Sequence, residues 1–242
     1  MRSFPRGISW LYDVQRFLGT RALGVAFDVG ANRGQTLDQL LRFAPAAQIY
    51  SFEPAFETFG QLEKGYKGRP NVHLFNLAVG AKPDRMALQV GVNSELNTLV
   101  ARHAPEAPSQ MVDITTVDAI VGACGLSHVD LLKIDVQGWE MEVMRGAARL
   151  IAEQNLLFVF AEVTFRTDQK EMQQFGELHS HLESSGFSLC GFYEPLRYGP
   201  RKEFVLFANA LYLHPQARLK WTSLGHEWSE WESREAASRE TV

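Results

Sequence analysis

Acidic residues stand at the ends of two successive apolar segments near the start of the chain. The stretch AFDVGANRGQTLDQLL, residues 26–41, passes from an apolar run through Asp28 into a loop with Gly30 and Gly34, and then into a helical pattern. The next apolar run ends in Glu53. A glycine-containing turn after a strand lets a ligand approach the backbone closely, and an acid ending the second strand can bind both ribose hydroxyls. These residues predict a nucleotide-type cofactor site.

Asp28 indicates which cofactor suits this turn. The spacing is D-x-G-x-x-x-G, and Asn32 stands where a dinucleotide fingerprint has its middle glycine. A carboxylate at the turn disfavours a pyrophosphate and favours cationic groups. S-adenosylmethionine carries an ammonium, a sulfonium and a ribose, so it fits both acids. The alternative, in which Asp28 only caps the turn and Glu53 is a solvated strand end, stays open at this point.

A second group of charged residues follows a later apolar segment. In VDLLKIDVQGWEMEVMRGA, residues 129–147, the segment ends in Lys133 and Asp135, and a glycine then opens a helical pattern that carries Glu140. The next apolar segment ends in AEV, which puts Glu162 at a similar height. Charges at strand ends beside a cleft are candidates for chemistry. Asp135 and Glu162 are therefore candidate proton acceptors, unless Lys133 pairs with a neighbouring acid and only stabilises a loop.

Alternating strand-like and helix-like segments position these residues. We expect strands at 24–29, 47–53, 71–79, 129–135, 155–163, 187–193 and 203–213, and helices at 35–44, 55–66, 139–151 and 170–186. Residues 85–92 and 111–117 look like further extended pieces around a long loop. This alternation predicts an α/β fold with a mostly parallel sheet covered on both faces. The last two strands lack a helix between them, which predicts an antiparallel hairpin at one edge.

The bulk composition is that of a soluble globular protein. The chain has 242 residues, 45% of them apolar and 21% charged, and a formal net charge of -4, so it lacks the basic field expected of a nucleic-acid-binding protein. Cys124 and Cys190 show no zinc-ligand spacing and are expected to stay reduced. The N-terminal segment lacks the apolar core of a signal peptide, and no segment is long and apolar enough to span a membrane. We expect a cytoplasmic protein.

Three regions are expected along the chain. Residues 1–24 form an N-terminal amphipathic helical extension, residues 25–213 form the cofactor-binding domain, and residues 214–242 form a polar tail. Apolar residues at helical spacing define one face of the extension: Trp10, Leu11, Val14, Phe17 and Leu18. Tail residues Trp221, Leu224, Trp228 and Trp231 are expected to dock on the domain or on a partner subunit. A homodimer is consistent with both features.

Six segments together resemble one family. FDVGANRGQT, SFEP, NLAVG, DITTVD, LLKIDVQGWE and AEV occur in the order and spacing of the FkbM family of S-adenosylmethionine-dependent methyltransferases, over residues 25–213. The resemblance implies the class I methyltransferase fold, a Rossmann-like doubly wound sheet of seven strands with the last antiparallel. It also implies O-methylation of a hydroxyl on a sugar, a glycan or a polyketide-type molecule.

The resemblance assigns roles to individual residues. Asn76 and Ala78 are expected near the adenine, and Asp135 resembles the active-site acid. The expected cofactor contacts are Asp28, Gly30, Ala31, Asn32, Gly34, Gln35, Glu53, Pro54, Asn76 and Ala78, and the expected catalytic residues are Lys133, Asp135, Gln137 and Glu162. One position departs from the family, which usually reads KIDVEG where this chain has Gln137. The change argues against a metal-assisted mechanism and leaves an amide that can bind substrate.

Three alternatives remain open at the level of the sequence. An NAD-dependent dehydrogenase uses the same fold but favours glycines around Asn32 and no Asp28. A methyltransferase-derived binding module without activity is supported mainly by Gln137. The acceptor atom can also be nitrogen or carbon instead of oxygen.

The residues that bind the methyl acceptor show no clear sequence pattern. The N-terminal helix and the loops 93–110, 164–170 and 193–203 are expected to contact it, and 93–110 is long enough to form a lid. In the last loop Tyr193, Tyr198, Arg197 and Arg201 suit a sugar or an anionic group, or are solvated. No motif singles out a histidine base among His73, His103 and His128.

Overall fold

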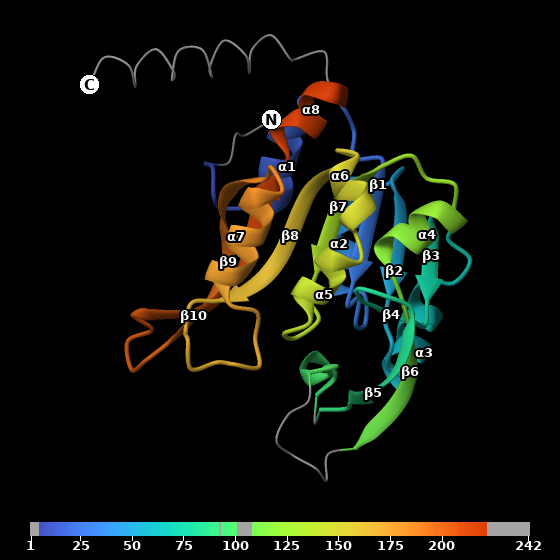
Figure 1. Ribbon diagram of the computed structural model, residues 1–242, viewed down its shortest axis with the longest axis vertical. Helices are drawn as coiled ribbons and strands as arrows, with labels where there is room; N and C mark the ends of the chain where they lie inside the picture. The colour runs from blue at the N-terminus through green and yellow to red at the C-terminus, as the bar shows by residue number, and fades with distance from the viewer. Residues whose placement is uncertain (1–4, 92, 101–107, 222–242) are drawn as a thin grey trace.

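A seven-stranded sheet forms the centre of the protein. The computed structural model describes residues 5–91, 93–100 and 108–221 (Figure 1). The strand order is β3-β2-β1-β7-β8-β10-β9. The strands are β1 (Val25–Val29), β2 (Gln48–Phe52), β3 (Val72–Phe75), β7 (Val129–Ile134), β8 (Leu156–Thr164), β9 (Ser188–Tyr198) and β10 (Phe204–Leu213).

The directions of the strands confirm the expected sheet. The pairs β1–β2, β2–β3, β1–β7 and β7–β8 are parallel, whereas β10 runs antiparallel to β8 and to β9. The carboxyl ends of β1, β2, β7 and β8 therefore meet at one edge of the sheet. In this register Asp28 lies opposite both Ser51 and Lys133, so strand pairing places polar residues side by side at this edge.

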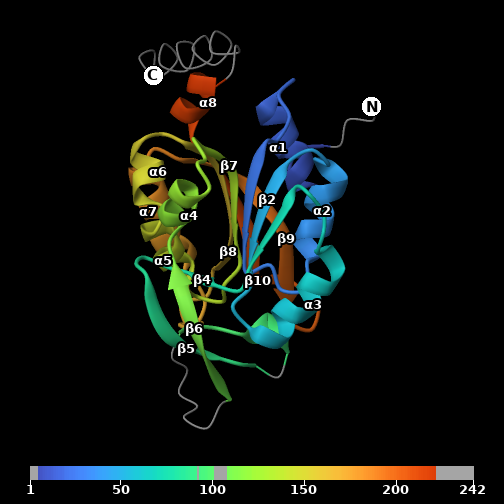
Figure 2. The ribbon, with the colours of Figure 1, turned by 90° about the vertical axis from the view of Figure 1, so that its right-hand side faces the viewer.

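Helices cover both faces of the sheet, as Figure 2 shows. One face carries α1 (Trp10–Leu18), α2 (Gln35–Phe43) and α3 (Phe56–Tyr66). The other face carries α4 (Val117–Ala123), α5 (Glu140–Arg145), α6 (Ala148–Ala152) and α7 (Phe175–Ser184). Each face buries its own apolar cluster, and every residue of β7 is buried between them. Continuous apolar strands are what a sheet covered on both sides requires.

Helix α1 is packed on the sheet by apolar and polar contacts. The ring of Trp10 stacks on Phe160 of β8 with centroids 4.4 Å apart. Asp13 is buried and accepts hydrogen bonds from the hydroxyl of Tyr193 at 2.8 Å and from the backbone of Gly7 at 2.7 Å. A buried carboxylate with several donors fixes the helix in one position. Tyr193 thus holds α1 on the sheet, whereas the sequence suggested that it belongs to a loop that contacts the acceptor.

A second, smaller sheet lies beyond the carboxyl ends of the central strands. Its order is β4-β6-β5, from β4 (Ala78–Val79), β5 (Asp84–Gln89) and β6 (Ser109–Thr115). The short 3₁₀-helix η1 (Ser94–Leu96) follows β5. Figure 1 shows this sheet below the arrowheads of the main sheet. The extended pieces expected near 85–92 and 111–117 correspond to β5 and β6.

Two expected elements are each divided in the structure. Residues 71–79 form β3 and β4 with a break at Asn76, whose side chain donates to the carbonyls of Glu53 and Pro54 and turns the chain away from the main sheet. Residues 139–151 form α5 and α6 with a break at Gly146. A Cβ on Gly146 would lie 2.1 Å from the carbonyl oxygen of Gly80, so the helix breaks where the small sheet touches it.

Other boundaries differ from the expectations. Helix α7 begins at Phe175 instead of residue 170, because the backbone of Gln173 accepts a hydrogen bond from Thr164 and continues the loop. Helices α4 and α8 (Pro215–Trp221) were not expected. Tail residues 222–242, including Leu224, Trp228 and Trp231, lie outside the described residues. The proposed division at residues 24 and 213 stays a prediction.

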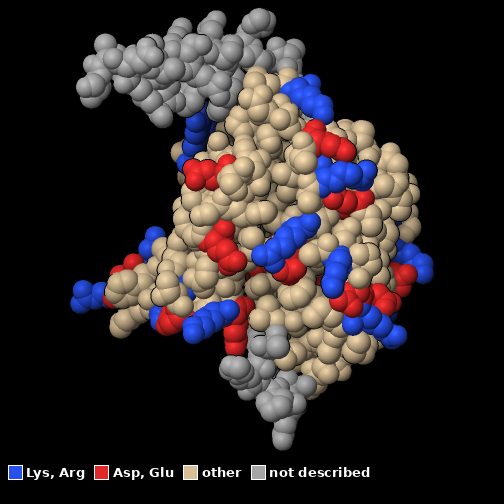
Figure 3. Space-filling view, viewed as in Figure 1, with Lys and Arg blue, Asp and Glu red and all other residues tan. Residues whose placement is uncertain are grey.

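The surface carries charges of both signs. Figure 3 shows Lys and Arg side chains interspersed with Asp and Glu over the face in view, in keeping with the formal net charge of -4. Within the described part of the chain, no helix has the length and the apolar character needed to cross a membrane.

Candidate active site

A cavity of about 490 Å³ lies at the carboxyl ends of the central strands. This volume is typical of sites for small molecules and cofactors. The strand-end loops supply Val29, Gly30, Ala31, Asn32, Gln35, Thr36, Glu53, Pro54, Lys133, Asp135, Val136, Gln137, Trp139, Glu162 and Phe207 to its walls. The small sheet and the segments beside it supply Ala78, Val79, Leu88, Ser94, Glu95, Asn97, Thr98, Leu99 and Met172.

The turn after β1 is held against its neighbours by backbone contacts. The N–H groups of Gly30 and Ala31 donate to the carbonyl of Phe52 at 3.0 and 2.9 Å. Gly30 has φ 77°, and a Cβ there would lie 1.9 Å from the carbonyl oxygen of Asp135. Only glycine fits both this conformation and this approach. The turn therefore brings the β1 loop directly against the β7 loop, which joins the two groups of site residues.

Glu53 closes one end of the cavity. Its Oε2 accepts from the backbone of Asn32 at 3.0 Å and its Oε1 from that of Ala55 at 2.9 Å. Burial raises the pKa of Glu53 to about 7, although the two backbone hydrogen bonds act in the opposite direction. Each carboxylate oxygen can accept more than one hydrogen bond. Glu53 thus keeps acceptor capacity for hydroxyl groups in the cavity.

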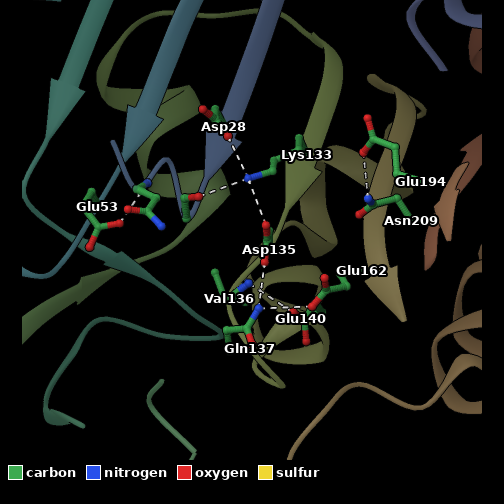
Figure 4. A network of polar contacts seen from close by, with 12 residues as sticks. Asp28, Glu53, Lys133, Asp135, Val136, Gln137, Glu140, Glu162, Glu194 and Asn209 are labelled. Atoms are coloured by element: carbon green, nitrogen blue, oxygen red, sulfur yellow. Dashed lines mark hydrogen bonds and ion pairs between the residues drawn. The ribbon is translucent and has the colours of Figure 1, made fainter. Parts of the chain in front are cut away.

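Lys133 links the two groups of acids beneath the cavity (Figure 4). Its Nζ lies 3.1 Å from Asp28 Oδ1 and 3.7 Å from Asp135 Oδ2, and it donates to the carbonyl of Gly30 at 3.0 Å. Burial alone lowers the pKa of Lys133, but the charges of Asp28 and Asp135 outweigh it and the net direction is upward. Lys133 therefore stays a cation whose charge is taken up by these partners.

Asp28 lies behind Lys133 and not against the cavity. The residue has no exposed surface, and burial raises the pKa of its carboxyl despite the nearby ammonium of Lys133. From the sequence, Asp28 was expected near the cationic end of a cofactor. The structure instead makes it the buried counter-ion of Lys133, because strand pairing sets the two side by side. Asp28 affects the cavity through Lys133.

Two carboxylates meet at the other end of the cavity. Nε2 of Gln137 donates to Asp135 Oδ1 and to Glu162 Oε2, both at 3.1 Å (Figure 4). Burial, followed by the charges of Asp135 and Glu140, raises the pKa of Glu162 to about 8. A carboxyl group with a pKa near the working pH suits proton transfer. The cavity is thus lined by Glu53 and, apart from it, by the pair of acids Asp135 and Glu162 (Figure 4).

The loop after β7, which contains Gly138, is fixed by Glu140. Its Oε1 accepts from the backbone of Val136 at 3.1 Å and its Oε2 from that of Gly138 at 3.0 Å. Glu140 is buried, and this burial raises its pKa to about 7. The carboxylate bonds to the loop that leads into its own helix, so it shapes the loop and does not face the cavity.

Comparison with known proteins identifies the family. Residues 28–189 match the model of the methyltransferase FkbM domain. This match covers more than half of the chain. The chain belongs to the FkbM methyltransferase family.

Relatives and solved structures agree with this assignment. "Methyltransferase 1" of Beauveria bassiana is 27% identical over 184 residues, which cover 67% of this chain and 72% of that protein. The crystal structure of a methyltransferase FkbM from Methylobacillus flagellatus superposes with a TM-score of 0.52 and 15% identity, over 79% of this chain and 43% of that one. The METTL16 methyltransferase domain superposes with a TM-score of 0.51 and 10% identity, over 84% of this chain and 64% of that one. This chain thus spans less than two thirds of both solved chains, and at these identities they show the fold alone.

FkbM membership favours a methyltransferase over the dehydrogenase alternative, and the sheet is the class I methyltransferase sheet. Most residues carried over from the family resemblance line the cavity: Gly30, Ala31, Asn32, Gln35, Glu53, Pro54, Ala78, Lys133, Asp135, Gln137 and Glu162. Asp28, Gly34 and Asn76 stand behind its wall. The carbonyl of Gly34 accepts from the hydroxyl of Tyr66 at 3.1 Å. Asn76 fixes the end of β2 through the bonds described above.

The remaining candidates of the FkbM chain lie away from the cavity. His73 stacks on Tyr50 at 4.5 Å, and His128 precedes β7 at the opposite edge of the sheet. The Tyr198 ring carries the guanidinium of Arg166 at 4.8 Å. Arg197 and Arg201 contact Glu203 in the β9–β10 hairpin. His103 falls outside the described residues.

Apart from Ala78, residues of the small sheet and of the segment after β5 were not singled out as site residues. Ser94 donates to Asn32 Oδ1 at 2.8 Å, and Thr98 donates to the carbonyl of Gln137 at 2.7 Å, so the segment after β5 is tied to both ends of the cavity. Trp139 adds an aromatic wall. The length of the 93–110 loop was the one available signal, since serine, threonine and leucine have no pattern specific to a site.

Proposed function

We propose that this protein transfers the methyl group of S-adenosylmethionine to a hydroxyl of an uncharged acceptor, a sugar, a glycan or a polyketide-type molecule. One observation carries the proposal: a single cavity is lined by Glu53, which keeps acceptor capacity, and, apart from it, by the Asp135–Glu162 pair (Figure 4). Glu53 suits a nucleoside. The acid pair suits removal of a proton from an acceptor.

The residues present fit S-adenosylmethionine. Glu53 has free acceptor capacity for the ribose, and the close turn at Gly30 lets a ligand approach the loop backbone. Pro54, Ala78, Val79, Leu88 and Trp139 give an apolar wall for adenine. When bound, the cofactor supplies a methyl group activated by its sulfonium. The negative charges of Asp135 and of the ionised form of Glu162 favour the positive charge of the sulfonium.

Proton removal is assigned to the acid pair. Holding acceptor oxygen and methyl group in line supplies most of the rate, and a positioned base adds about 10²–10⁴-fold. Glu162 is the stronger candidate for taking the proton, because its pKa of about 8 is close to the working pH. Asp135 orients the hydroxyl and stays paired with Lys133. In the part of the chain that the structure describes, no group of three or more metal-ligating side chains can hold a metal ion.

The charges around the cavity favour an uncharged acceptor. Lys133 is the only basic side chain among the described cavity residues, and its charge is taken up by two acids. Asp135, Glu162 and Glu95 face the same space. Figure 3 shows mixed charges on one face of the molecule and no continuous basic track. These features disfavour phosphate-bearing acceptors and hence nucleic acids.

The first experiment is a calorimetric titration with S-adenosylhomocysteine, the product form of the cofactor. We expect a Kd in the micromolar range or tighter for the wild type, and loss of most binding in Glu53→Gln. Glu63→Gln, on the exposed face of α3, is the matched control. No binding by folded wild-type protein would refute the proposal. Binding without turnover on a panel of hydroxylated glycans and polyketides would instead favour the binding-module alternative.

A further inference from the structure

The amide of Gln137 joins the two carboxylates at the acceptor end of the cavity. Its Nε2 donates to Asp135 Oδ1 and to Glu162 Oε2, both at 3.1 Å (Figure 4). An amide nitrogen has two hydrogens, so both are used on these acids. Gln137 therefore cannot donate to an acceptor without releasing one of them. This geometry differs from the expectation that the amide binds substrate.

The backbone holds Gln137 in this place. Its φ of 55° is in the left-handed region, which costs a residue with a Cβ roughly 1–2 kcal/mol. Thr98 donates to its carbonyl at 2.7 Å. A Cβ on the next residue, Gly138, would lie 2.2 Å from the carbonyl oxygen of Glu171, so the loop is packed tightly on both sides. Strain of this kind persists where the surroundings determine the conformation.

The charges around Glu162 show what the amide does. Asp135 on the β7 loop and Glu140 on α5 raise the pKa of Glu162, as burial does, whereas Lys133 on β7 lowers it. On β10, Asn209 lies opposite Glu162 and donates to Glu194 of β9. The hydrogen bond from Gln137 also lowers the pKa of Glu162. Gln137 is thus an uncharged donor that lowers the pKa of Glu162, against the upward effect of Asp135 and Glu140.

We propose that Gln137 is a positioning residue whose amide holds Asp135 and Glu162 in place and stabilises the ionised form of Glu162. A glutamate at this position would put a third carboxylate beside two others. We call the two hydrogen bonds from Gln137 to Asp135 and Glu162 the clamp. Its role in catalysis rests on the proposed function. The clamp itself can be measured without cofactor or acceptor.

The test is a pH titration of the Glu162 side chain by carbon-detected NMR. The full chain carries ¹³C-labelled glutamate, and Glu162→Gln assigns the signal by removing it. In Gln137→Gly, which tolerates the left-handed backbone, we expect the pKa of Glu162 to rise by about one to two units, the effect of losing a hydrogen bond to a charged group. In Gln137→Glu the like charge should also raise it. Gln48→Glu adds the same charge at the far end of β2 and should leave it unchanged.

An unchanged pKa of Glu162 in folded Gln137→Gly would overturn the proposal. If that variant does not fold, Gln137→Glu decides in the same way. Failure of the proposed function is a separate result, because it is measured by cofactor binding and turnover of the wild type. Where an acceptor is found, the acidic limb of kcat/KM, along which the base loses its proton, should move to higher pH in Gln137→Glu by the shift that NMR measures.

Discussion

At the scale of the residue, one buried lysine organises the site. Lys133 lies within 4 Å of Asp28 and Asp135 and donates to the carbonyl of Gly30. Lys133 thereby neutralises Asp28, which has no contact with solvent, and holds Asp135, which faces the cavity. Removing one partner of such a buried pair leaves a charge without compensation, which is strongly destabilising.

Asp135 gives the sharpest test at this scale. Asp135→Asn keeps the shape of the side chain but removes the charge that orients the acceptor. We expect turnover to fall below detection while the Kd for S-adenosylhomocysteine stays within a few-fold of the wild type. Calorimetry and a methyl-transfer assay measure the two quantities. Asp38→Asn on the exposed face of α2 is the control, and wild-type turnover in Asp135→Asn would remove Asp135 from the mechanism.

Most of the site residues predicted from the sequence line the cavity, but the arrangement of their contacts was not predicted. Glu53, Asp135 and Glu162 were predicted because acids at the ends of parallel strands must share one edge. The position of Asp28 could not be predicted, because its partner Lys133 is 105 positions away and meets it only through strand pairing. The bridge formed by Gln137 depends in the same way on β8.

At the scale of the element, the turn between β1 and α2 is the most constrained segment. It bonds to β2 through Phe52 and touches the β7 loop at Asp135. Three strands therefore depend on one glycine conformation. A change in this turn should affect stability and the cavity together.

A glycine pair tests this constraint. Gly30→Ala should lower the free energy of unfolding by several kcal/mol, because its Cβ would lie 1.9 Å from the Asp135 carbonyl oxygen and φ is 77°. Gly60 lies in α3 and has no atom within 4 Å of an added Cβ. Gly60→Ala should therefore raise the free energy of unfolding by about 0.5–1 kcal/mol. Urea unfolding measures both. Equal effects of the two substitutions would show that the close approach at Gly30 does not constrain the turn.

At the scale of the whole molecule, three buried glutamates have pKa values raised to about 7 or 8: Glu53 and Glu162 line the cavity, and Glu140 holds the loop beside it. Burial is the largest cause for Glu53 and Glu140, with pKa values of about 7, and for Glu162, with a value of about 8. Their ordinary value is 4.5. The folded protein therefore holds these protons at a pH where the unfolded chain has released them.

Stability should consequently fall as the pH rises. The contribution is fully present below pH 4.5 and is lost by about pH 8, at up to about 1.4 kcal/mol per pH unit for each group. Urea unfolding at pH 5.5, 7 and 8.5 measures this slope. It should be shallower in Glu162→Gln and unchanged in Glu63→Gln. A stability that rises over this range in the wild type would contradict the prediction.

The sequence by itself determined the alternation of the main strands and helices, the hairpin of the last two strands and the acids at the strand ends. These features are local, because they follow from apolar periodicity and from backbone conformation. The tertiary structure decided that Asp28 pairs with Lys133, that Gln137 bridges Asp135 and Glu162, and that the segment after β5 closes over the cavity. Each of these contacts joins distant parts of the chain, so its geometry exists only once the strands are in register and the small sheet is packed against them.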